Sequence, residues 1–471
     1  MDRAKSEFRS QKPEGKAADA EPKAGKRPYE KPSIARHTVN LMGKPGRFPG
    51  ITTTRQIEGL QVSDLVERHG SPLFVGSERV LRERYRELYR AFSTRYPNFQ
   101  VAWSYKTNYL KSVCSLYHKL GAWAEVVSGF EYELARRLNR PGSEIIFNGP
   151  YKDEADLERA FKDGARVHAD NYDELARMEL VASRTGLAPE IGIRINLDCG
   201  MYPAWTRFGF NLESGEAFQA VQRIRNSPRL KLAGLHCHIG TFIIDAELYR
   251  RASTKLVSFA KYIEAELGVK VKYLDLGGGY ASENTLHTQW LPGGQVNPTI
   301  DQFAEAITSP LMAANYRPDE RPLLIVEPGR VLVDDGFQLI STVVANKRMP
   351  DGKPSIVIDA GVNVLFTSFW YKHEVAPSSE TSFISELTAV YGPLCMNIDL
   401  VHPAALLPPL PLGTRLVFKH VGAYNMTQWM QFIRLRPAVV MVMQDGKVET
   451  LRTAETADYV QELERIPDAL K

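Results

Sequence analysis

The stretch "VAWSYKTN", residues 101–108, places one lysine, Lys106, at the end of a short apolar run and just before a polar turn. A lysine among apolar neighbours has a lowered pKa, and its free amine can form a Schiff base with an aldehyde. A lysine at the end of a strand can equally well reach solvent and have no chemical role. Lys106 is therefore a candidate covalent site only if other reactive groups gather around it.

Seven further runs of strand length follow, and polar or titratable side chains lie at or near their ends. The eight expected strands cover residues 100–106, 122–127, 144–148, 166–170, 191–196, 231–239, 271–277 and 322–329. Their ends carry Lys106, Glu125 and Ser128, Asn148, Asp170, Arg194 and Asn196, His238, the glycine run Gly277, Gly278 and Gly279, and Glu327 followed by Arg330. In a closed parallel sheet these ends meet at one mouth.

Pyridoxal 5'-phosphate needs a set of groups that this end of the barrel provides: an amine, an imidazole, a carboxylate, a glycine run and an arginine. Successive glycines expose backbone N–H groups to a phosphate, and Arg330 adds positive charge. A carboxylate such as Glu327 keeps the ring nitrogen protonated, which makes the ring a strong electron sink. His238 could stack on the ring face. Each residue alone also has an ordinary structural interpretation, as a salt-bridge partner, a tight turn or a core histidine.

Helices must connect the expected strands. Segments such as 153–165 and 171–186 repeat apolar residues at helical spacing and contain glycine at or near their ends. Eight strands with seven or eight helices over about 250 residues predict an α/β fold, a (β/α)8 barrel over residues 73–335. A doubly wound open sheet is the alternative, but it would carry GxGxxG or GxxxxGK near its start, and neither pattern is found there.

After residue 336 the pattern changes to short strands separated by Gly, Pro and Asp turns. Residues 336–471 are therefore expected to form an all-β domain, in which "QDGK" is a hairpin turn. The segment 37–72 is expected to pair with this domain. Residues 1–36 have the Lys-, Pro-, Ala- and Glu-rich composition of a disordered basic tail.

Charge and composition exclude several functional classes. Residues 1–40 hold ten Lys/Arg and six Asp/Glu (10 − 6 = +4), which accounts for the whole net charge of +4. The remainder is neutral overall, so no nucleic-acid partner is expected. No apolar run is long enough to span a bilayer, and no signal segment opens the chain, so a cytoplasmic location without membrane partners is expected. The four cysteines lack CxxC spacing, so we expect free thiols and no metal site.

These residues resemble the fold type III, alanine racemase-like pyridoxal-phosphate enzymes, and among them the diaminopimelate and ornithine decarboxylases, over residues 65–445. The resemblance rests on "SYKTN", "GLHCHIGT", "LDLGGGY", "VEPGR", "VIDAGVN", "YGPLC" and "VGAY". It implies Lys106 as the Schiff-base lysine, His238 as the stacking histidine and Glu327 as the pyridinium carboxylate. It places Thr241, Gly277, Gly278, Gly279, Gly329, Arg330 and Tyr424 around the phosphate. It also implies a head-to-tail homodimer with shared sites, in which Cys395 is the proton donor for the other subunit.

Three positions depart from the family pattern. The family's aspartate after the second strand is Glu125 here, and the family's HIGS element reads HIGT, which puts Thr241 in place of the serine. In both decarboxylases the residue after the cysteine is an acid that holds the substrate's distal ammonium, whereas this chain has Met396, which cannot pair with an ammonium. Asp399 matches a later family aspartate and, with Met396, is expected at the substrate, although less directly placed.

The resemblance and the residues together predict decarboxylation of a small amino-acid substrate whose far end is not a simple ammonium. Such a substrate could be carboxylated, amidated or carrier-tethered, as in a specialised biosynthetic route. The alternative is an amino-acid racemase, but Glu327 disfavours it, because alanine racemase-like enzymes place an arginine at the ring nitrogen. A noncatalytic pyridoxal-phosphate carrier would have a lone barrel, and a nucleic-acid-binding module would rest on the tail alone.

Overall fold

Eight parallel strands close into a ring in the computed structural model, which describes residues 52–380 and 384–471; the expected tail 1–36 lies outside them. The ring closes because β10 pairs with both β8 and β11. All eight expected barrel strands are present, and a short β9 (Phe210–Asn211) adds to β8. The ring strands are β4 (Phe99–Ser104), β5 (Trp123–Val126), β6 (Ile145–Phe147), β7 (Arg166–Ala169), β8 (Glu190–Asn196), β10 (Lys231–His236), β11 (Tyr273–Asp275) and β12 (Leu323–Val326).

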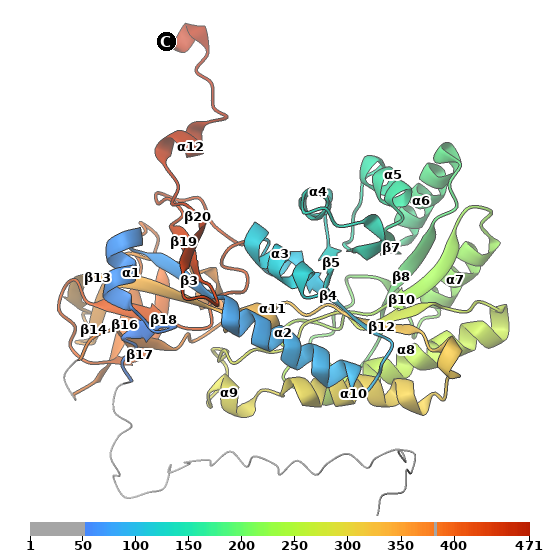
Figure 1. The fold of residues 1–471 in the computed structure, drawn as a ribbon, viewed down its shortest axis with the longest axis horizontal. Helices are drawn as coiled ribbons and strands as arrows, with labels where there is room; N and C mark the ends of the chain where they lie inside the picture. Colours follow the sequence, from blue (N-terminus) through green and yellow to red (C-terminus); the bar gives the residue numbers. More distant parts are fainter. Residues whose placement is uncertain (1–51, 381–383) are drawn as a thin grey trace, which may run out of the picture. The chain divides into compact units, whose positions relative to one another are not determined.

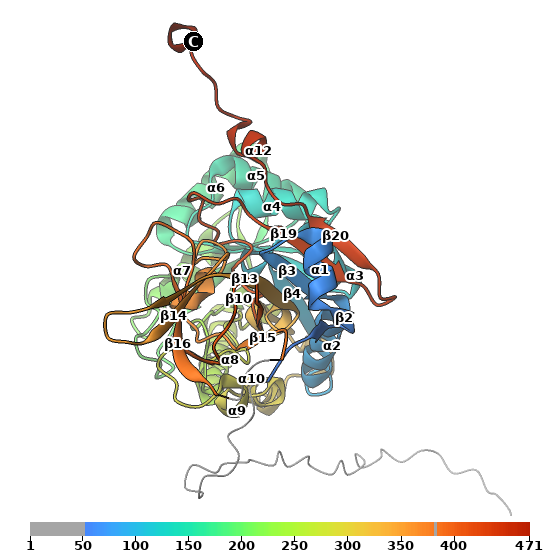
Figure 2. The ribbon, with the colours of Figure 1, turned by 90° about the vertical axis from the view of Figure 1, so that its left-hand side faces the viewer.

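Helices surround this ring (Figure 2). The two expected helical segments form α5 and α6, whose N-cap residues Asp153 and Asn171 accept backbone N–H groups of the first turn. Both helices end at a glycine with a φ of 71°, Gly164 and Gly186, a conformation that glycine adopts at little cost. The barrel helices are α2 (Glu78–Ser93), α3 (Lys111–Lys119), α4 (Gly129–Arg137), α5 (Glu154–Asp163), α6 (Tyr172–Thr185), α7 (Glu216–Asn226), α8 (Ala246–Leu267), α9 (Gly293–Val296), α10 (Ile300–Ala313) and α11 (Arg330–Val333).

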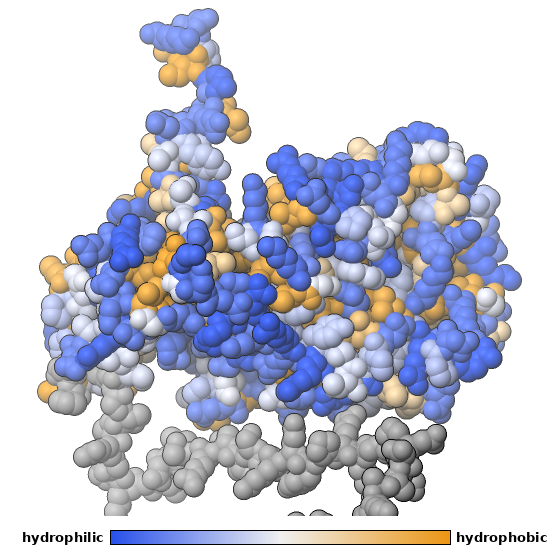
Figure 3. All heavy atoms as spheres, viewed as in Figure 1, coloured by the Kyte–Doolittle hydropathy of each residue, from blue (hydrophilic) through white to orange (hydrophobic). Residues whose placement is uncertain are grey.

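Each long helix buries one stripe of apolar residues and leaves the other side polar. In α2, Leu81, Tyr85, Leu88 and Phe92 are buried in the main core. Its outer positions are mostly Arg and Glu, and they give this face its hydrophilic surface (Figure 3). This amphipathic pattern is what the helical periodicity predicts for a barrel's outer layer.

A second sheet follows the barrel, with the strand order β17-β16-β14-β13-β3-β19-β20 (Figure 1). The expected hairpin is present, because β19 and β20 are joined through "QDGK", where the Met443 N–H donates to the Lys447 carbonyl at 2.8 Å. The strands are β3 (Leu73–Ser77), β13 (Phe337–Arg348), β14 (Pro354–Ile358), β16 (Glu386–Tyr391), β17 (Leu400–Leu407), β19 (Ala438–Val442) and β20 (Val448–Arg452), with β15 (Val375–Pro377) and β18 (Arg415–Phe418) beside β13.

The first strand of this sheet differs from the expected domain boundary. Residues 73–77, expected in the barrel, form β3, which pairs with β13 on one side and β19 on the other. Its partners lie more than 250 residues away in the chain. All five of its residues are buried, as in a central strand.

The described part of the segment before β3 packs on the same sheet. Thr54 donates its backbone N–H to the Pro377 carbonyl at 2.9 Å, and Ile57, Val62 and Leu65 join an apolar cluster with residues of β3, β13, β18 and β19. The remaining elements are β1 (Gln56–Ile57), β2 (Leu60–Gln61), α1 (Val62–His69), α12 (Ala457–Gln461) and five 3-10 turns, η1 (Tyr105–Thr107), η2 (Gly142–Glu144), η3 (Pro318–Glu320), η4 (Phe366–Phe369) and η5 (Asp468–Leu470).

None of the helices in the described ranges combines the length and apolarity that crossing a bilayer requires.

Candidate active site

The C-terminal ends of the barrel strands open into a cavity of about 730 Å³ that residues of the β domain help to line. Of the residues singled out from the sequence, Lys106, Glu125, His238, Thr241, Gly279, Glu327, Gly329, Arg330 and Tyr424 line this cavity. The structure therefore brings together nearly all of the groups expected around the cofactor. Cys395, Met396 and Asp399 are not among the lining residues.

Lys106 lies in η1, the turn that directly follows β4. The Thr427 hydroxyl donates to the Lys106 carbonyl at 2.8 Å and holds this turn. The Lys106 Nζ lies 2.6 Å from Glu125 Oε2, which also accepts from the Ser104 hydroxyl at 2.6 Å. The lysine side chain is 35% exposed, whereas the Glu125 side chain is buried.

The expected lowering of the Lys106 pKa is wrong for the chain without its cofactor. Burial does favour the neutral amine, but the negative charges of Glu125 and Glu327 outweigh it and raise the pKa of Lys106. Lys106 is thus an ammonium paired with a carboxylate. It must give up its proton before its nitrogen can attack an aldehyde.

Glu327 follows β12 directly and is 3% exposed. Its backbone N–H donates to the Gly277 carbonyl at 2.8 Å, which aligns the ends of β11 and β12. Asn148 donates to Glu327 Oε1 at 2.6 Å and to Glu125 Oε1 at 3.1 Å. The second Glu327 oxygen, Oε2, lies 3.5 Å from His236 Nε2.

His238 and the glycine run contact each other. The Gly278 N–H donates to His238 Nδ1 at 3.0 Å, so the ring proton is on Nε2. Burial lowers the pKa of His238 well below its usual value, so the ring is neutral. A Cβ at Gly278 would lie 2.0 Å from the Glu327 carbonyl, and one at Gly279 would lie 2.2 Å from the Gly240 carbonyl. Only glycine fits this close backbone approach.

Arg330 forms the positive end of the cavity. Its two terminal nitrogens donate to the Thr241 hydroxyl at 3.2 and 3.3 Å, and its Nε is buried without a hydrogen-bond partner in the described part of the chain. Its guanidinium carbon lies 5.1 Å from the ring centroids of Phe242 and Tyr424. The Tyr424 N–H donates to the Thr107 carbonyl at 2.7 Å, which ties this loop of the β domain to the Lys106 turn.

The cavity residues fit pyridoxal 5'-phosphate. Arg330, the Thr241 hydroxyl and the glycine backbone form a cradle for a phosphate. A buried carboxylate, Glu327, and a lysine amine occupy the same cavity, as a ring nitrogen and an aldehyde require. The unpaired Arg330 Nε is a donor that a bound anion would satisfy.

Asp399, which is expected at the substrate, has a structural role in its own chain. It is 2% exposed, and its two carboxylate oxygens accept backbone N–H groups from Val362 at 2.8 Å and Leu394 at 2.7 Å. These two bonds tie the "YGPLC" loop, which contains Leu394, to the segment of Val362. Cys395, in contrast, is exposed, and Met396 beside it is half-buried.

Several residues of the cavity were not predicted as site residues. Asn148 and Arg194 were visible from the sequence as polar ends of barrel strands, but nothing in the sequence indicated a function for them. His236 lies in the same motif as His238 and resembles an ordinary core histidine. An outer aromatic wall, formed by Trp205 and Phe208 of the barrel and by Phe369 and Trp370 of the β domain, was also missed, because sequence spacing does not show that such distant segments line one cavity.

Comparisons with known proteins agree with this geometry. A family model described as "Pyridoxal-dependent decarboxylase, pyridoxal binding domain" matches residues 82–334, more than half of the chain. The diaminopimelate decarboxylase of Methanocaldococcus jannaschii is 29% identical over 446 residues, covering 91% of this chain and 97% of that protein. That of Aquifex aeolicus is 28% identical over 421 residues, covering 86% of this chain and 94% of that protein.

Solved structures give the same result. The crystal structure of the M. jannaschii diaminopimelate decarboxylase superposes with a TM-score of 0.81 at 28% identity, covering 89% of this chain and 98% of that chain. The Helicobacter pylori diaminopimelate decarboxylase, crystallised with L-lysine, gives a TM-score of 0.76 at 25% identity, covering 85% and 98%. Together with the residues that line the cavity of the barrel, these matches show that the chain belongs to the family of pyridoxal-dependent decarboxylases.

Proposed function

We propose that this chain removes the carboxylate of an α-amino acid with pyridoxal 5'-phosphate held on Lys106. The observation that carries the proposal is that one cavity holds the Lys106 amine, its carboxylate partner at 2.6 Å, and a second buried carboxylate, Glu327. When bound, the cofactor supplies the sink for the electron pair that remains after the carbon–carboxylate bond breaks. The chain's own residues bind it, orient it and move protons.

Each cavity residue has a defined role in this proposal. Lys106 tethers the cofactor, and Glu125 accepts the proton of its ammonium or holds it in place. Glu327 keeps the ring nitrogen protonated, while the neutral imidazole of His238 covers one ring face. The phosphate is bound by Arg330 and Thr241, by the backbone of Gly277, Gly278, Gly279 and Gly329, and by Tyr424.

The substrate is an amino acid whose distal end is not a simple ammonium. Among the described residues that line the cavity, the carboxylates are Glu125 and Glu327, and both are engaged in holding the cofactor. The outer wall is aromatic, and Met396 replaces the acid expected after the cysteine. An amidated, carboxylated or carrier-tethered amino acid meets these conditions, because none of them leaves a bare distal ammonium to be paired.

Carbon dioxide release from the cofactor-loaded protein tests this function. We expect little release from lysine, ornithine and meso-diaminopimelate, and rapid release from an α-amino acid whose distal amine is acylated. Rapid release from a free diamino acid would contradict the substrate class but support the reaction. Exchange of the α-hydrogen without release of carbon dioxide, across the whole panel, would contradict decarboxylation itself.

The functional unit in this proposal is a homodimer with shared sites. Cys395 is exposed and lies outside the cavity of its own chain, as a residue that serves another subunit would. It would return a proton to the substrate carbon after the carboxylate has left. Asp399 holds this loop within its own chain.

Substitution of Cys395 separates this role from cofactor binding. Cys395→Ala should slow turnover by about 100-fold, the usual scale for loss of a general acid, while the visible absorbance of the bound cofactor stays. Asn397→Ala, an exposed neighbour in the same loop, is the control. Mixing Cys395→Ala with Lys106→Ala protein should restore activity, because a mixed dimer contains one complete site. Absence of recovery in verified mixed dimers would argue against shared sites.

A further inference from the structure

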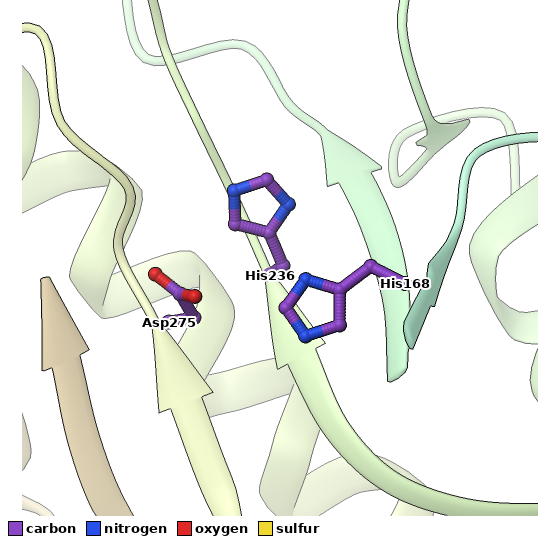
Figure 4. A group of neighbouring side chains, drawn as sticks. All are labelled: His168, His236 and Asp275. Atoms are coloured by element: carbon purple, nitrogen blue, oxygen red, sulfur yellow. The ribbon is translucent and has the colours of Figure 1, made fainter. Parts of the chain in front are cut away.

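A buried hydrogen-bond chain lies beneath the cavity and ends on both of its carboxylates. His168 belongs to this chain, and it lies beside His236 and Asp275, which approach it from β10 and β11 (Figure 4). His168 Nδ1 lies 2.6 Å from Asn148 Oδ1, and His168 Nε2 lies 2.9 Å from the Tyr273 hydroxyl. Asn148 then contacts Glu125 and Glu327 through its amide nitrogen.

The direction of each hydrogen bond follows from the groups at its ends. Ionised carboxylates only accept, so the Asn148 nitrogen faces Glu125 and Glu327 and its oxygen faces His168. An amide oxygen only accepts, so His168 carries its proton on Nδ1. Burial lowers the pKa of His168 well below its usual value, which leaves Nε2 without a proton and able to accept from the Tyr273 hydroxyl.

This assignment excludes a metal ion at the His168, His236 and Asp275 cluster. The three residues offer ligand atoms within 4.8 Å of one another. Both nitrogens of His168 are nevertheless used in hydrogen bonds, so His236 and Asp275 alone remain, and two ligands do not make a metal site.

The surrounding strands make room for the hydrogen-bond chain. A Cβ at Gly192 in β8 would lie 2.4 Å from the His168 ring and 2.7 Å from the Tyr273 hydroxyl. A Cβ at Gly234 in β10 would lie 2.1 Å from the Tyr273 ring. The two rings therefore fill space that only glycine leaves inside these strands.

We infer that Asn148 is a positioning residue that holds Glu125 and Glu327 at a fixed separation, and that His168 keeps its amide turned with the nitrogen toward them. Glu125 pairs with the cofactor lysine, and Glu327 faces the site of the ring nitrogen. One amide thereby links the groups at the two ends of the proposed cofactor, before the cofactor arrives. A flipped Asn148 would turn its oxygen toward two carboxylates and repel both.

The test compares a donor role with a packing role at Asn148. Asn148→Asp keeps the side-chain shape but places a third carboxyl group beside Glu125 and Glu327, where it either repels both or, once protonated, donates to only one. Asn148→Ala removes the group altogether. The quantity to measure is the concentration of pyridoxal 5'-phosphate that half-restores the visible absorbance of cofactor-depleted protein at neutral pH.

If Asn148 acts as a donor, Asn148→Asp should raise this concentration about tenfold or more, at least as much as Asn148→Ala does. Binding by Asn148→Asp within about twofold of the wild type would overturn the inference, because shape alone would then suffice. Tyr96→Phe is the control. It removes an equally buried hydroxyl that donates to the Pro322 carbonyl at 2.8 Å, at the opposite end of the barrel.

A second pair of variants, at His168, tests the orientation of the Asn148 amide. If Asn148→Asp does not fold, this second experiment is the test of the inference. His168→Asn retains an N–H donor near the position of Nδ1, whereas His168→Leu removes it. We expect His168→Asn to bind the cofactor several-fold more tightly than His168→Leu, and equal binding by the two would overturn the role of His168. The inference rests on the proposed cofactor site, but the experiment distinguishes a failure of the inference from a failure of the proposed site. If the proposed site is wrong, the wild-type protein itself does not bind pyridoxal 5'-phosphate.

Discussion

At the scale of single residues, the charge of Lys106 is the main feature of the site. Two carboxylates raise its pKa, although burial acts in the opposite direction. A protonated amine is a poor nucleophile, so in the proposed function Glu125 takes or shares the proton of Lys106. Binding of a cofactor whose cationic ring nitrogen engages Glu327 would neutralise one of the two negative charges and make that deprotonation easier.

The same scale shows what residue types alone could and could not predict. Lys106, His238, Glu327 and Arg330 were predictable, because each lies at the end of an expected strand and their chemistry is complementary. The direction of the Lys106 pKa shift was not, since it depends on an Nζ to Oε2 distance of 2.6 Å. The role of Asp399 was not predictable either, because a sequence does not show that two backbone N–H groups occupy its oxygens.

At the scale of elements, Lys106, His238 and Glu327 lie just after their strands, whereas Glu125 lies within β5. β4 ends at Ser104, β10 at His236 and β12 at Val326, whereas the expected strands continued through Lys106, His238 and Glu327. Because these three residues lie outside the hydrogen bonding of the sheet, their side chains can turn toward the cavity that they line. The strands themselves were predictable, because a barrel requires apolar runs at regular spacing, and every expected barrel strand is present.

The assignment of β3 to the second sheet could not be predicted from the periodicity of the sequence. The sequence "LFVGS" is a short apolar run next to the barrel's first helix and has the composition of a barrel strand. Its partners, β13 and β19, are distant in sequence, and pairing over such distances is decided by the packing of both faces. The outer aromatic wall of the cavity was missed for the same reason, because Trp205 and Phe208 follow β8, whereas Phe369 and Trp370 lie at the end of η4, far away in the chain.

At the scale of the whole molecule, an ion-pair network ties the barrel to the β domain. Arg84 of α2 pairs with Glu283, in the loop after β11, and with Asp335, just before β13. Asp335 also accepts from His420 Nδ1 at 2.6 Å, in the loop after β18. Burial opposes the charge on His420, but Asp335 and the nearby acids outweigh it and raise the pKa of His420.

This network predicts a pH-dependent stability. The folded-state pKa of His420 is raised, so its contribution is full below the ordinary histidine pKa of about 6.5 and is lost as the pH rises through the folded value. His420→Asn should therefore lower the free energy of unfolding by about 1.5–3 kcal/mol at acidic pH, and by less above neutrality. Urea unfolding of the cofactor-loaded protein across this pH range measures the difference.

The control for this measurement is His69→Asn, a half-buried histidine of α1 that has no ion pair among the described residues. The change that His69→Asn causes in the free energy of unfolding should not show the pH dependence expected for His420→Asn. A difference between wild type and His420→Asn that grew as the pH rose would contradict the assigned charge state, because it would mean that the neutral form of His420 is the stabilising one.

The central claim is that Lys106 carries the cofactor, and reductive labelling tests it most directly. Borohydride treatment of the cofactor-loaded protein fixes a lysine-bound pyridoxal group, and mass spectrometry of the digest locates it. We predict the label on the peptide that contains Lys106, and its absence, together with the loss of visible absorbance, in Lys106→Ala. Label on another lysine, such as the buried Lys152 at the same end of the barrel, or visible absorbance that persists in Lys106→Ala, would contradict the account.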